Sequence, residues 1–229
     1  MVNYKELKDK TPDELIELAQ KYLSIEEYTD VERILCELLD SVPDHPQALF
    51  ILGKVYSKME RKGLANTLYR KALEGAPERS ELWGAIGASI DSYVNPEEAQ
   101  KYLKKAIQLN PENEAAWVNL SNSYALDGKY TKSVEAAERV LQFQPDSIAG
   151  HDNYGMSCLA LGRWEEGWDG VEWALGHGYR PETQFGEEGR WEGEKGQSVI
   201  VYGMQGIGDE ILYSSCVPDL IEDSREAVS

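Results

Sequence analysis

The sequence predicts an all-α protein, an α-solenoid in which pairs of helices stack one after another. The first observation behind this prediction is a self-similarity with a fixed step, the interval that separates Trp83 from Trp117. The same step relates the prolines Pro43, Pro77, Pro111 and Pro145. The second observation is that apolar residues recur at helical spacing inside each unit. A fixed period of this size is typical of supersecondary units that bury their apolar faces only against their neighbours.

Within each unit, aromatic, small and apolar residues occupy fixed positions. In residues 80–113 these positions hold Trp83, Ile86, Gly87, Ile90, Ala99, Leu103, Ala106 and Pro111. In residues 114–147 they hold Trp117, Leu120, Ser121, Tyr124, Ser133, Ala137, Val140 and Pro145. The pattern resembles the tetratricopeptide repeat (TPR) family, whose repeat follows the order W-x2-L-G-x2-Y, then A-x3-F, then P.

The resemblance implies five repeats in one register, each a pair of antiparallel helices. The repeats are residues 12–45, 46–79, 80–113, 114–147 and 148–181. A lead-in at residues 1–11 precedes them. Because each repeat buries its face only against its neighbours, the resemblance implies a right-handed superhelix with one continuous core.

Residues with known capping preferences mark the ends of the predicted helices. Thr11 and Pro12 predict a helix start, with Thr11 as the N-cap and Pro12 at the first helical position. Asn95 before Pro96 predicts the same arrangement for the second helix of the third repeat. Gly128 predicts a turn between two helices, because glycine adopts positive φ without steric cost.

Small residues and tryptophans indicate how the predicted helices pack. Gly53, Gly87 and Gly155 fall where the first helix of a repeat crosses the second, which predicts a close approach of the two helices. The second helix of the fifth repeat carries tryptophans at positions 164, 168 and 173. Terminal repeats are often atypical because they cap the stack. So large an aromatic surface predicts that this helix contacts a later part of the chain.

The chain is strongly acidic, with 23 Lys and Arg residues against 41 Asp and Glu residues and a formal net charge of −18. Phosphate backbones and anionic membrane surfaces repel such a chain, so neither nucleic acid nor a membrane is an expected partner. The cysteines and histidines show no metal-ligand spacing, and no metal or cofactor is predicted. The N-terminal residues lack the apolar stretch of a secretory signal peptide, and we expect a cytoplasmic location.

The C-terminal part changes in character. Residues 182–197 are rich in Gly and Glu and predict a linker. Residues 198–229 predict a strand, a glycine loop and a helix, the opening of an α/β unit. Gly206 and Gly208 before a helix start suggest an anion-binding loop, because backbone N–H groups and the helix dipole favour negative charge there. The alternative interpretation is a structural turn in which Asp209 caps the helix.

This segment also resembles a second family, on the residues Trp191-x-Gly193, 199–202, 205–211 and Pro218. It is similar to the start of the heptosyltransferase-like GT-B glycosyltransferase domains that follow TPR arrays in bacterial and phage proteins. The resemblance implies that Asp209 corresponds to the base that activates the acceptor hydroxyl. Such enzymes need two Rossmann-like halves, and only the start of the first is present here. We therefore expect Asp209 to be a vestigial catalytic residue and the chain to be inactive as a transferase.

TPR arrays bind peptides on the surface lined by the first helix of each repeat. By register, the residues on this surface include Phe50, Ile51, Lys54, Asn119, Asn122, Asp152, Asn153 and Met156. The resemblance to O-linked N-acetylglucosamine transferases implies that Asn119 and Asn153, at equivalent positions, form two rungs of an asparagine ladder that grips a peptide backbone. An amide suits this role because it both donates and accepts hydrogen bonds. The alternative is that these residues are merely solvated.

Two functional hypotheses follow, with a third possibility for assembly. The first is a protein-interaction scaffold that binds a peptide or partner protein in the groove of the first helices. The second is the substrate-recruiting N-terminal part of a glycosyltransferase, heptosyltransferase-like or O-GlcNAc-transferase-like. In the third, the strand at 199–202 pairs between two chains and forms a homodimer through the C-terminal tail.

Overall fold

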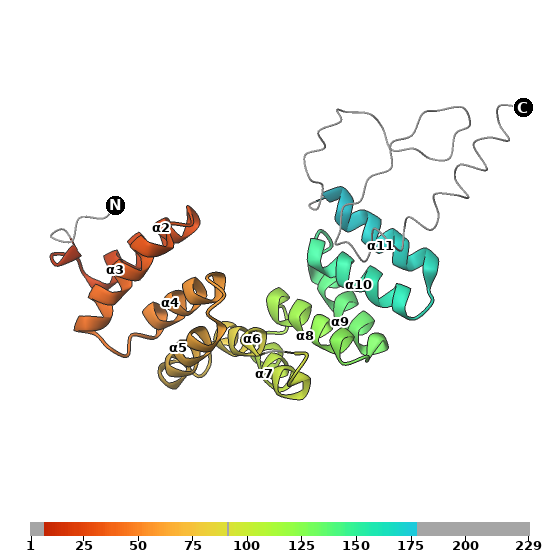
Figure 1. The fold of residues 1–229 in the computed structure, drawn as a ribbon, viewed down its shortest axis with the longest axis horizontal. Coiled ribbons are helices and arrows are strands. Elements are labelled where there is room, and N and C mark those ends of the chain that lie inside the picture. The colour runs from red at the N-terminus through yellow and green to blue at the C-terminus, as the bar shows by residue number, and fades with distance from the viewer. Residues whose placement is uncertain (1–6, 91, 178–229) are drawn as a thin grey trace, which may run out of the picture. The chain divides into compact units, whose positions relative to one another are not determined.

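The computed structural model describes residues 7–90 and 92–177, and these residues form a stack of helices (Figure 1). The linker predicted at 182–197 lies outside them. So do the strand, loop and helix predicted at 198–229, with Gly206, Gly208 and Asp209. None of the described residues lies in a β-strand, and none of the described helices is long and apolar enough to cross a lipid bilayer.

The helices alternate between first and second members of antiparallel pairs. The first helices are α2 (Pro12–Ser24), α4 (Pro46–Lys58), α6 (Ser80–Ser89), α8 (Glu114–Leu126) and α10 (Ile148–Ala160). The second helices are α3 (Tyr28–Ser41), α5 (Lys62–Gly75), α7 (Pro96–Leu109), α9 (Tyr130–Phe143) and α11 (Trp164–His177). Each first helix packs on the second helix of its own pair, and each second helix packs on the next first helix. The prediction of an all-α solenoid is therefore confirmed.

The start of the first repeat follows the predicted capping chemistry. Thr11 accepts a hydrogen bond from the backbone N–H of Glu14 through its side-chain oxygen, and its own N–H donates to the Glu14 carboxylate at 2.7 Å. Two otherwise unpaired donors are thus satisfied reciprocally. Asn95 occupies the N-cap position of α7 and Pro96 follows it in the first turn, as predicted, although the Asn95 side chain makes no capping hydrogen bond there.

The turn between the two helices of a repeat uses a left-handed residue at one fixed position. Positive φ occurs at Glu26, Glu60, Gly128 and Gly162. Any two of these residues are a whole number of repeat steps apart. The corresponding residue of the third repeat is Val94, which has no positive φ. A β-branched residue there would be a genuine steric outlier. In this repeat the first helix, α6, already ends at Ser89, and the connection to α7 takes another path.

The two helices of a repeat approach each other closely at the glycines, as predicted. A Cβ atom added to Gly53 would collide with the Tyr69 ring, and one added to Gly87 would lie 2.7 Å from Leu103. At Gly155 the nearest atom would be the backbone nitrogen of Val171, at 2.6 Å. Real Cβ atoms essentially never lie within 3.0 Å of such neighbours. Glycine is therefore required for the observed packing in three of the repeats.

The fourth repeat solves the same crossing with hydroxyl groups. Ser121 takes the position of the glycine, and its Oγ donates to the backbone carbonyl of Ser133 at 2.9 Å. Ser133 Oγ lies 2.8 Å from the backbone carbonyl of Ser121 and 2.7 Å from Ser157 Oγ. All three side chains are buried. The three buried hydroxyl groups thus find their hydrogen-bond partners within the protein, as buried polar groups generally do.

The aromatic position of the repeat makes a recurring hydrogen bond. The indole N–H of Trp83 donates to the Pro77 carbonyl at 2.8 Å, and that of Trp117 donates to the Pro111 carbonyl at 2.8 Å. His151 replaces the tryptophan in the fifth repeat, with its Nε2 2.8 Å from the carbonyl oxygen of Pro145. Its ring also stacks on Trp173, with centroids 3.7 Å apart. The histidine thus reproduces the link between a first helix and the loop before it.

The last described helix keeps part of its aromatic surface exposed. Trp164 is 64% exposed and Trp168 is 46% exposed in the described structure, whereas Trp173 packs on His151. The predicted contact of α11 with a later part of the chain involves residues that are not described, and it stays a prediction.

The turn geometry gives a first prediction. We expect Gly128→Ala to lower the free energy of unfolding by about 1 kcal/mol, because alanine at positive φ is strained. Gly63→Ala is the matched control: neither glycine has a neighbour within 4 Å of an added Cβ, but Gly63 lies in α5 without positive φ. There the same change should stabilise by about 0.5 kcal/mol. Urea unfolding followed by circular dichroism measures both, and equal signs would contradict the assignment of strain to φ.

The hydroxyl pairs give a second prediction. Ser133→Ala should cost about 1–2 kcal/mol of unfolding free energy, because it leaves buried partners on Ser121 and Ser157 with fewer hydrogen bonds. Ser123→Ala serves as control, since Ser123 Oγ is buried and has no hydrogen-bond partner in the described structure. Its removal should cost nothing or stabilise the fold slightly. A Ser123→Ala variant as unstable as Ser133→Ala would show that lost volume, not hydrogen bonding, sets the effect.

Candidate peptide-binding surface

Neighbouring first helices contact each other in most of the stack. Contacts join α2 with α4, α6 with α8 and α8 with α10. Among the described residues, no comparable contact joins consecutive second helices. The first helices are therefore closer together than the second helices, and we call their exposed side the inner surface. It carries the residues predicted to bind a peptide.

An aromatic ring with two cations marks the inner surface at the second repeat. Phe50 on α4 packs against Tyr69, with ring centroids 5.9 Å apart. Lys54 Nζ lies 5.4 Å from the Phe50 ring centroid, and the Arg79 guanidinium lies 5.3 Å from it. Arg79 also donates a hydrogen bond to the Gln47 side-chain oxygen. The geometry brings Phe50 and Lys54 together, as their placement one helical turn apart requires.

Sequence reasoning missed Arg79 and misplaced Ile51. Arg79 precedes α6, outside the helical register that was used to select residues, and only the packing of the loop on α4 brings it to Phe50. Ile51 is 2% exposed and belongs to the core that α2, α3 and α4 share, so it is not a groove residue. The contact between α2 and α4 covers this position.

The third repeat contributes almost no side-chain volume to the inner surface. Its first helix, α6, presents the partly exposed Ala85 and the exposed Ala88 there. The stretch between the Phe50 ring and the fourth repeat is therefore lined by methyl groups and backbone. A bound chain could approach α6 closely at this point.

Amide side chains line the fourth and fifth repeats. One N–H of Asn119 donates to the Ala115 carbonyl one turn earlier, at 2.7 Å. One N–H of Asn153 donates across to the Val118 carbonyl on α8, at 3.0 Å. Their Oδ1 atoms accept no hydrogen bond from any described residue, and Asn122 is exposed. Two amide oxygens at equivalent positions thus remain available to accept from a ligand.

The fifth repeat adds an apolar and an acidic residue. Met156 on α10 is 54% exposed, and its flexible thioether can adapt to different apolar side chains. Burial raises the pKa of the nearby Asp152 carboxyl above its ordinary value. Desolvation acts on this carboxylate because α10 packs against α8, α9 and α11.

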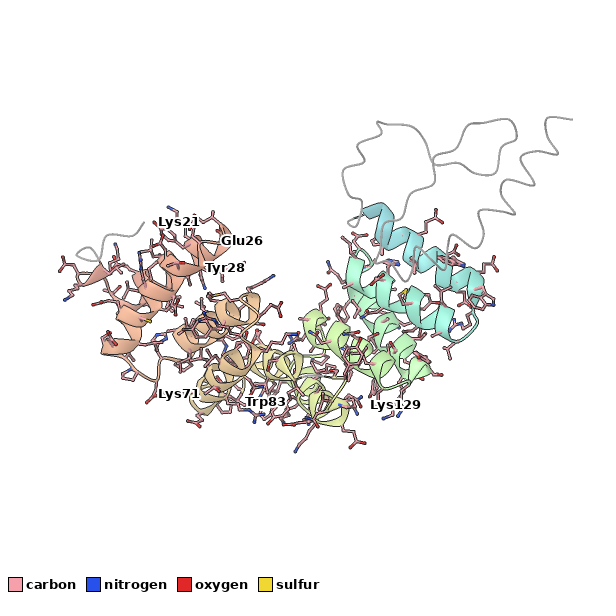
Figure 2. All side chains as sticks on the ribbon, in the orientation of Figure 1. Lys21, Glu26, Tyr28, Lys71, Trp83 and Lys129 are labelled. Atoms are coloured by element: carbon pink, nitrogen blue, oxygen red, sulfur yellow. The ribbon has the colours of Figure 1, made fainter. Side chains whose placement is uncertain are left out.

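A second concave feature lies among the second helices, and the sequence did not point to it. It is a cleft of about 950 Å³ between α7 and α9. Its floor is Tyr124 of α8, which is only 8% exposed. Figure 2 labels two of the lining residues, Trp83 and Lys129. We call this feature the outer cleft; it exists because consecutive second helices do not close on each other.

Hydrogen bonds at the rim of the outer cleft hold one carboxylate in its charged form. Lys129 Nζ lies 2.5 Å from Asp127 Oδ2, and Gln100 donates to the same oxygen at 3.1 Å. The bond from Lys129, and then that from Gln100, lowers the pKa of the Asp127 carboxyl. The same bond to Asp127 raises the pKa of the Lys129 ammonium. In the described part of the chain, no cluster of His, Cys, Asp and Glu side chains could hold a metal ion.

The amide geometry gives a third prediction, which separates binding from folding. Asn153→Ala should cost about 1 kcal/mol of unfolding free energy, because it removes a bond between two helices and leaves the Val118 side of that bond without its donor. Asn119→Ala removes only an exposed bond within one helix, and we expect a change below about 0.5 kcal/mol. Thermal unfolding of both variants measures the difference. Equal stability losses would contradict the distinct positions of the two amides.

Comparison with known proteins agrees with this architecture. Tetratricopeptide repeat models match residues 95–166 and residues 46–79. Protein FlbA of Caulobacter vibrioides is 23% identical over 186 residues, and the match covers 79% of this chain but only 31% of that protein. This chain therefore spans about a third of the length of that relative.

Solved structures show the same fold. The thermophilic TPR protein TTC0263 of Thermus thermophilus superposes with a TM-score of 0.62 at 18% identity, over 73% of this chain and 92% of that one. YrrB, described as a TPR protein with an unusual peptide-binding site, superposes with a TM-score of 0.55 at 20% identity, over 72% and 84% of the two chains. The helix pairs, their constant repeat step and these similarities lead to one conclusion: the chain contains tetratricopeptide repeats, stacked as an α-solenoid.

Proposed function

We propose that this protein is an interaction scaffold that binds a peptide segment of a partner protein on its inner surface. The observation that carries the proposal is the pair of amide oxygens on Asn119 and Asn153, which accept no hydrogen bond within the described structure. They lie on adjacent first helices and suit the N–H groups of an extended backbone. The peptide-binding site described for YrrB, which has the same fold, supports this use of a TPR array.

The neighbouring residues divide the inner surface by chemistry. At the second repeat, Phe50 with Lys54 and Arg79 offers an apolar ring flanked by positive charge. The small side chains of α6 leave room for a backbone. At the fifth repeat, Met156 offers an adaptable apolar contact. A peptide with an acidic or aromatic residue at one end and an apolar residue at the other would match this order.

A random peptide library displayed on phage tests the proposal on the whole chain. We expect selected peptides to bind Asn119→Ala/Asn122→Ala about tenfold more weakly than the wild type, because each lost amide contact contributes about 0.5–1.5 kcal/mol. The matched control is Asn110→Ala/Gln144→Ala, which removes two exposed amides at the C-terminal ends of α7 and α9, outside the lining of the outer cleft. Fluorescence anisotropy of labelled peptides measures the affinities.

The control also separates the inner surface from the second helices. Peptides that lose affinity only with Asn119→Ala/Asn122→Ala support the proposal. Peptides that bind this variant as tightly as the wild type, or that lose affinity only with the control variant, contradict it. Unchanged circular dichroism spectra of both variants ensure that the comparison reports on binding.

The alternative hypothesis, a recruiting part of a glycosyltransferase, depends on residues 198–229 and on Asp209. None of these residues is described by the structure, and no feature of the described inner surface favours a sugar donor. Pairing of two chains through the same segment likewise stays a prediction. The scaffold hypothesis is the one that the described geometry supports.

A further inference from the structure

The outer cleft combines positive charge with a buried aromatic ring, in a chain whose net charge is −18. Five lysines and a single carboxylate, that of Glu97, line it. Lys101, Lys104 and Lys105 come from α7, and Lys129 and Lys132 come from the start of α9 or the turn before it. The cleft therefore carries a local excess of positive charge, and a cleft lined by one sign of charge attracts ligands of the opposite sign.

Two of the lysines are placed on the aromatic floor. Lys104 Nζ lies 5.4 Å from the Tyr124 ring centroid, and Lys132 Nζ lies 5.9 Å from it. Neither ammonium forms a salt bridge with any described carboxylate. The two side chains reach the same ring from different helices, since α7 and α9 flank α8. Two ammonium groups therefore lie near the same tyrosine ring. Neither has a salt-bridge partner in the described structure.

The other three lysines of the cleft differ in whether they already bind a side chain of the protein itself. Lys129 is paired with Asp127, and Lys105 donates to Gln108 Oε1 at 3.1 Å on its own helix. Lys101 forms no salt bridge in the described structure. Glu135 and Glu138 line the continuation of the cleft along α9, together with Arg139. The excess of positive charge is thus concentrated around Lys101, Lys104 and Lys132.

We propose that the outer cleft is a second binding site, which takes a short acidic segment of a partner protein with its carboxylates on Lys104 and Lys132 above Tyr124. This site goes beyond the proposed function, because it lies on the second helices and uses charge rather than amide contacts. The long lysine stems and the floor formed by Tyr124 would cover the aliphatic or aromatic part of such a segment.

The surroundings of the cleft favour a peptide over a nucleic acid. A nucleic acid carries negative charge along its whole backbone, so the part beyond the cleft would meet the acidic surface of the solenoid. A short acidic segment confines its charge to a few residues. The cleft of about 950 Å³ is of the size that ligand pockets have and accommodates a few side chains.

The test measures binding of a short fluorescein-labelled peptide rich in Asp and Glu to the full chain by fluorescence anisotropy. The same peptide with Asn and Gln in place of the acids is the probe control. We expect the acidic peptide alone to bind, with an affinity that falls as salt is added. Lys104→Glu/Lys132→Glu should weaken this binding about tenfold or more, because two attractive contacts become repulsive.

A matched variant separates the cleft from the overall charge. Lys21→Glu/Lys58→Glu changes the net charge by the same amount at exposed lysines in the last turns of α2 and α4 (Lys21 is labelled in Figure 2). It should leave the affinity within about twofold of the wild type, since exposed distant charges are screened. If the double Glu variant does not fold, Lys104→Gln/Lys132→Gln removes both charges without reversal and should still weaken binding.

Four results would overturn the proposal. The first is equal affinity of the wild type for the acidic and the amide peptide. The second is an equal loss in the matched variant, which would assign the effect to net charge. The third is tighter binding of a single-stranded oligonucleotide, with the same dependence on Lys104 and Lys132, which would assign the cleft to nucleic acid. Loss of acidic-peptide binding in Asn119→Ala/Asn122→Ala would also contradict it, because that result would place the probe on the inner surface.

Discussion

The close crossing of the two helices inside each repeat is the constraint on which the rest of the structure depends. Gly53, Gly87 and Gly155 permit it because a Cβ atom would enter the opposite helix. Ser121 meets the same requirement with a hydrogen-bonded pair. With the crossing fixed inside each repeat, the second helix packs on the first helix of the next repeat, so each repeat contacts only its neighbours.

The inner surface and the outer cleft both result from that packing, one where neighbouring helices contact each other and the other where they lie apart. Contacts between first helices, such as α6 with α8 and α8 with α10, produce the inner surface, where side chains of these repeats line up in register. Second helices lie farther apart, and the outer cleft opens between α7 and α9 with Tyr124 of α8 as its floor. One surface thus offers amide groups at repeated positions, and the other offers lysines that only these two helices and the turn before α9 supply. Binding at one surface does not require the other.

The sequence was informative about the repeat architecture and much less about the sites. The recurring prolines, aromatic residues and small residues predicted the helix pairs, since each of these residue types answers a local steric demand. The capping residues Thr11 and Pro12 were sufficient to place the start of α2. The positions of Ile51 and Arg79 were not predictable in this way, because whether a helical face is covered depends on the neighbouring repeat. The turn of the third repeat was also not predictable from the repeat pattern. Val94 occupies the turn position at which the other repeats have a residue with positive φ, and the first helix of its repeat is shorter than the pattern predicts.

The sequence by itself determined that the chain forms antiparallel helix pairs, because apolar spacing, glycine positions and helix caps are local properties of the chain. Only the tertiary structure decided which polar side chains remain free to bind. Asn153 donates an N–H to the Val118 carbonyl, and Arg79 joins Phe50 from a loop, through contacts between repeats that no period within one repeat encodes. The outer cleft has the same origin. Lys104 and Lys132 come from different repeats, and only the packing of α7 and α9 around α8 brings both ammonium groups to one tyrosine ring.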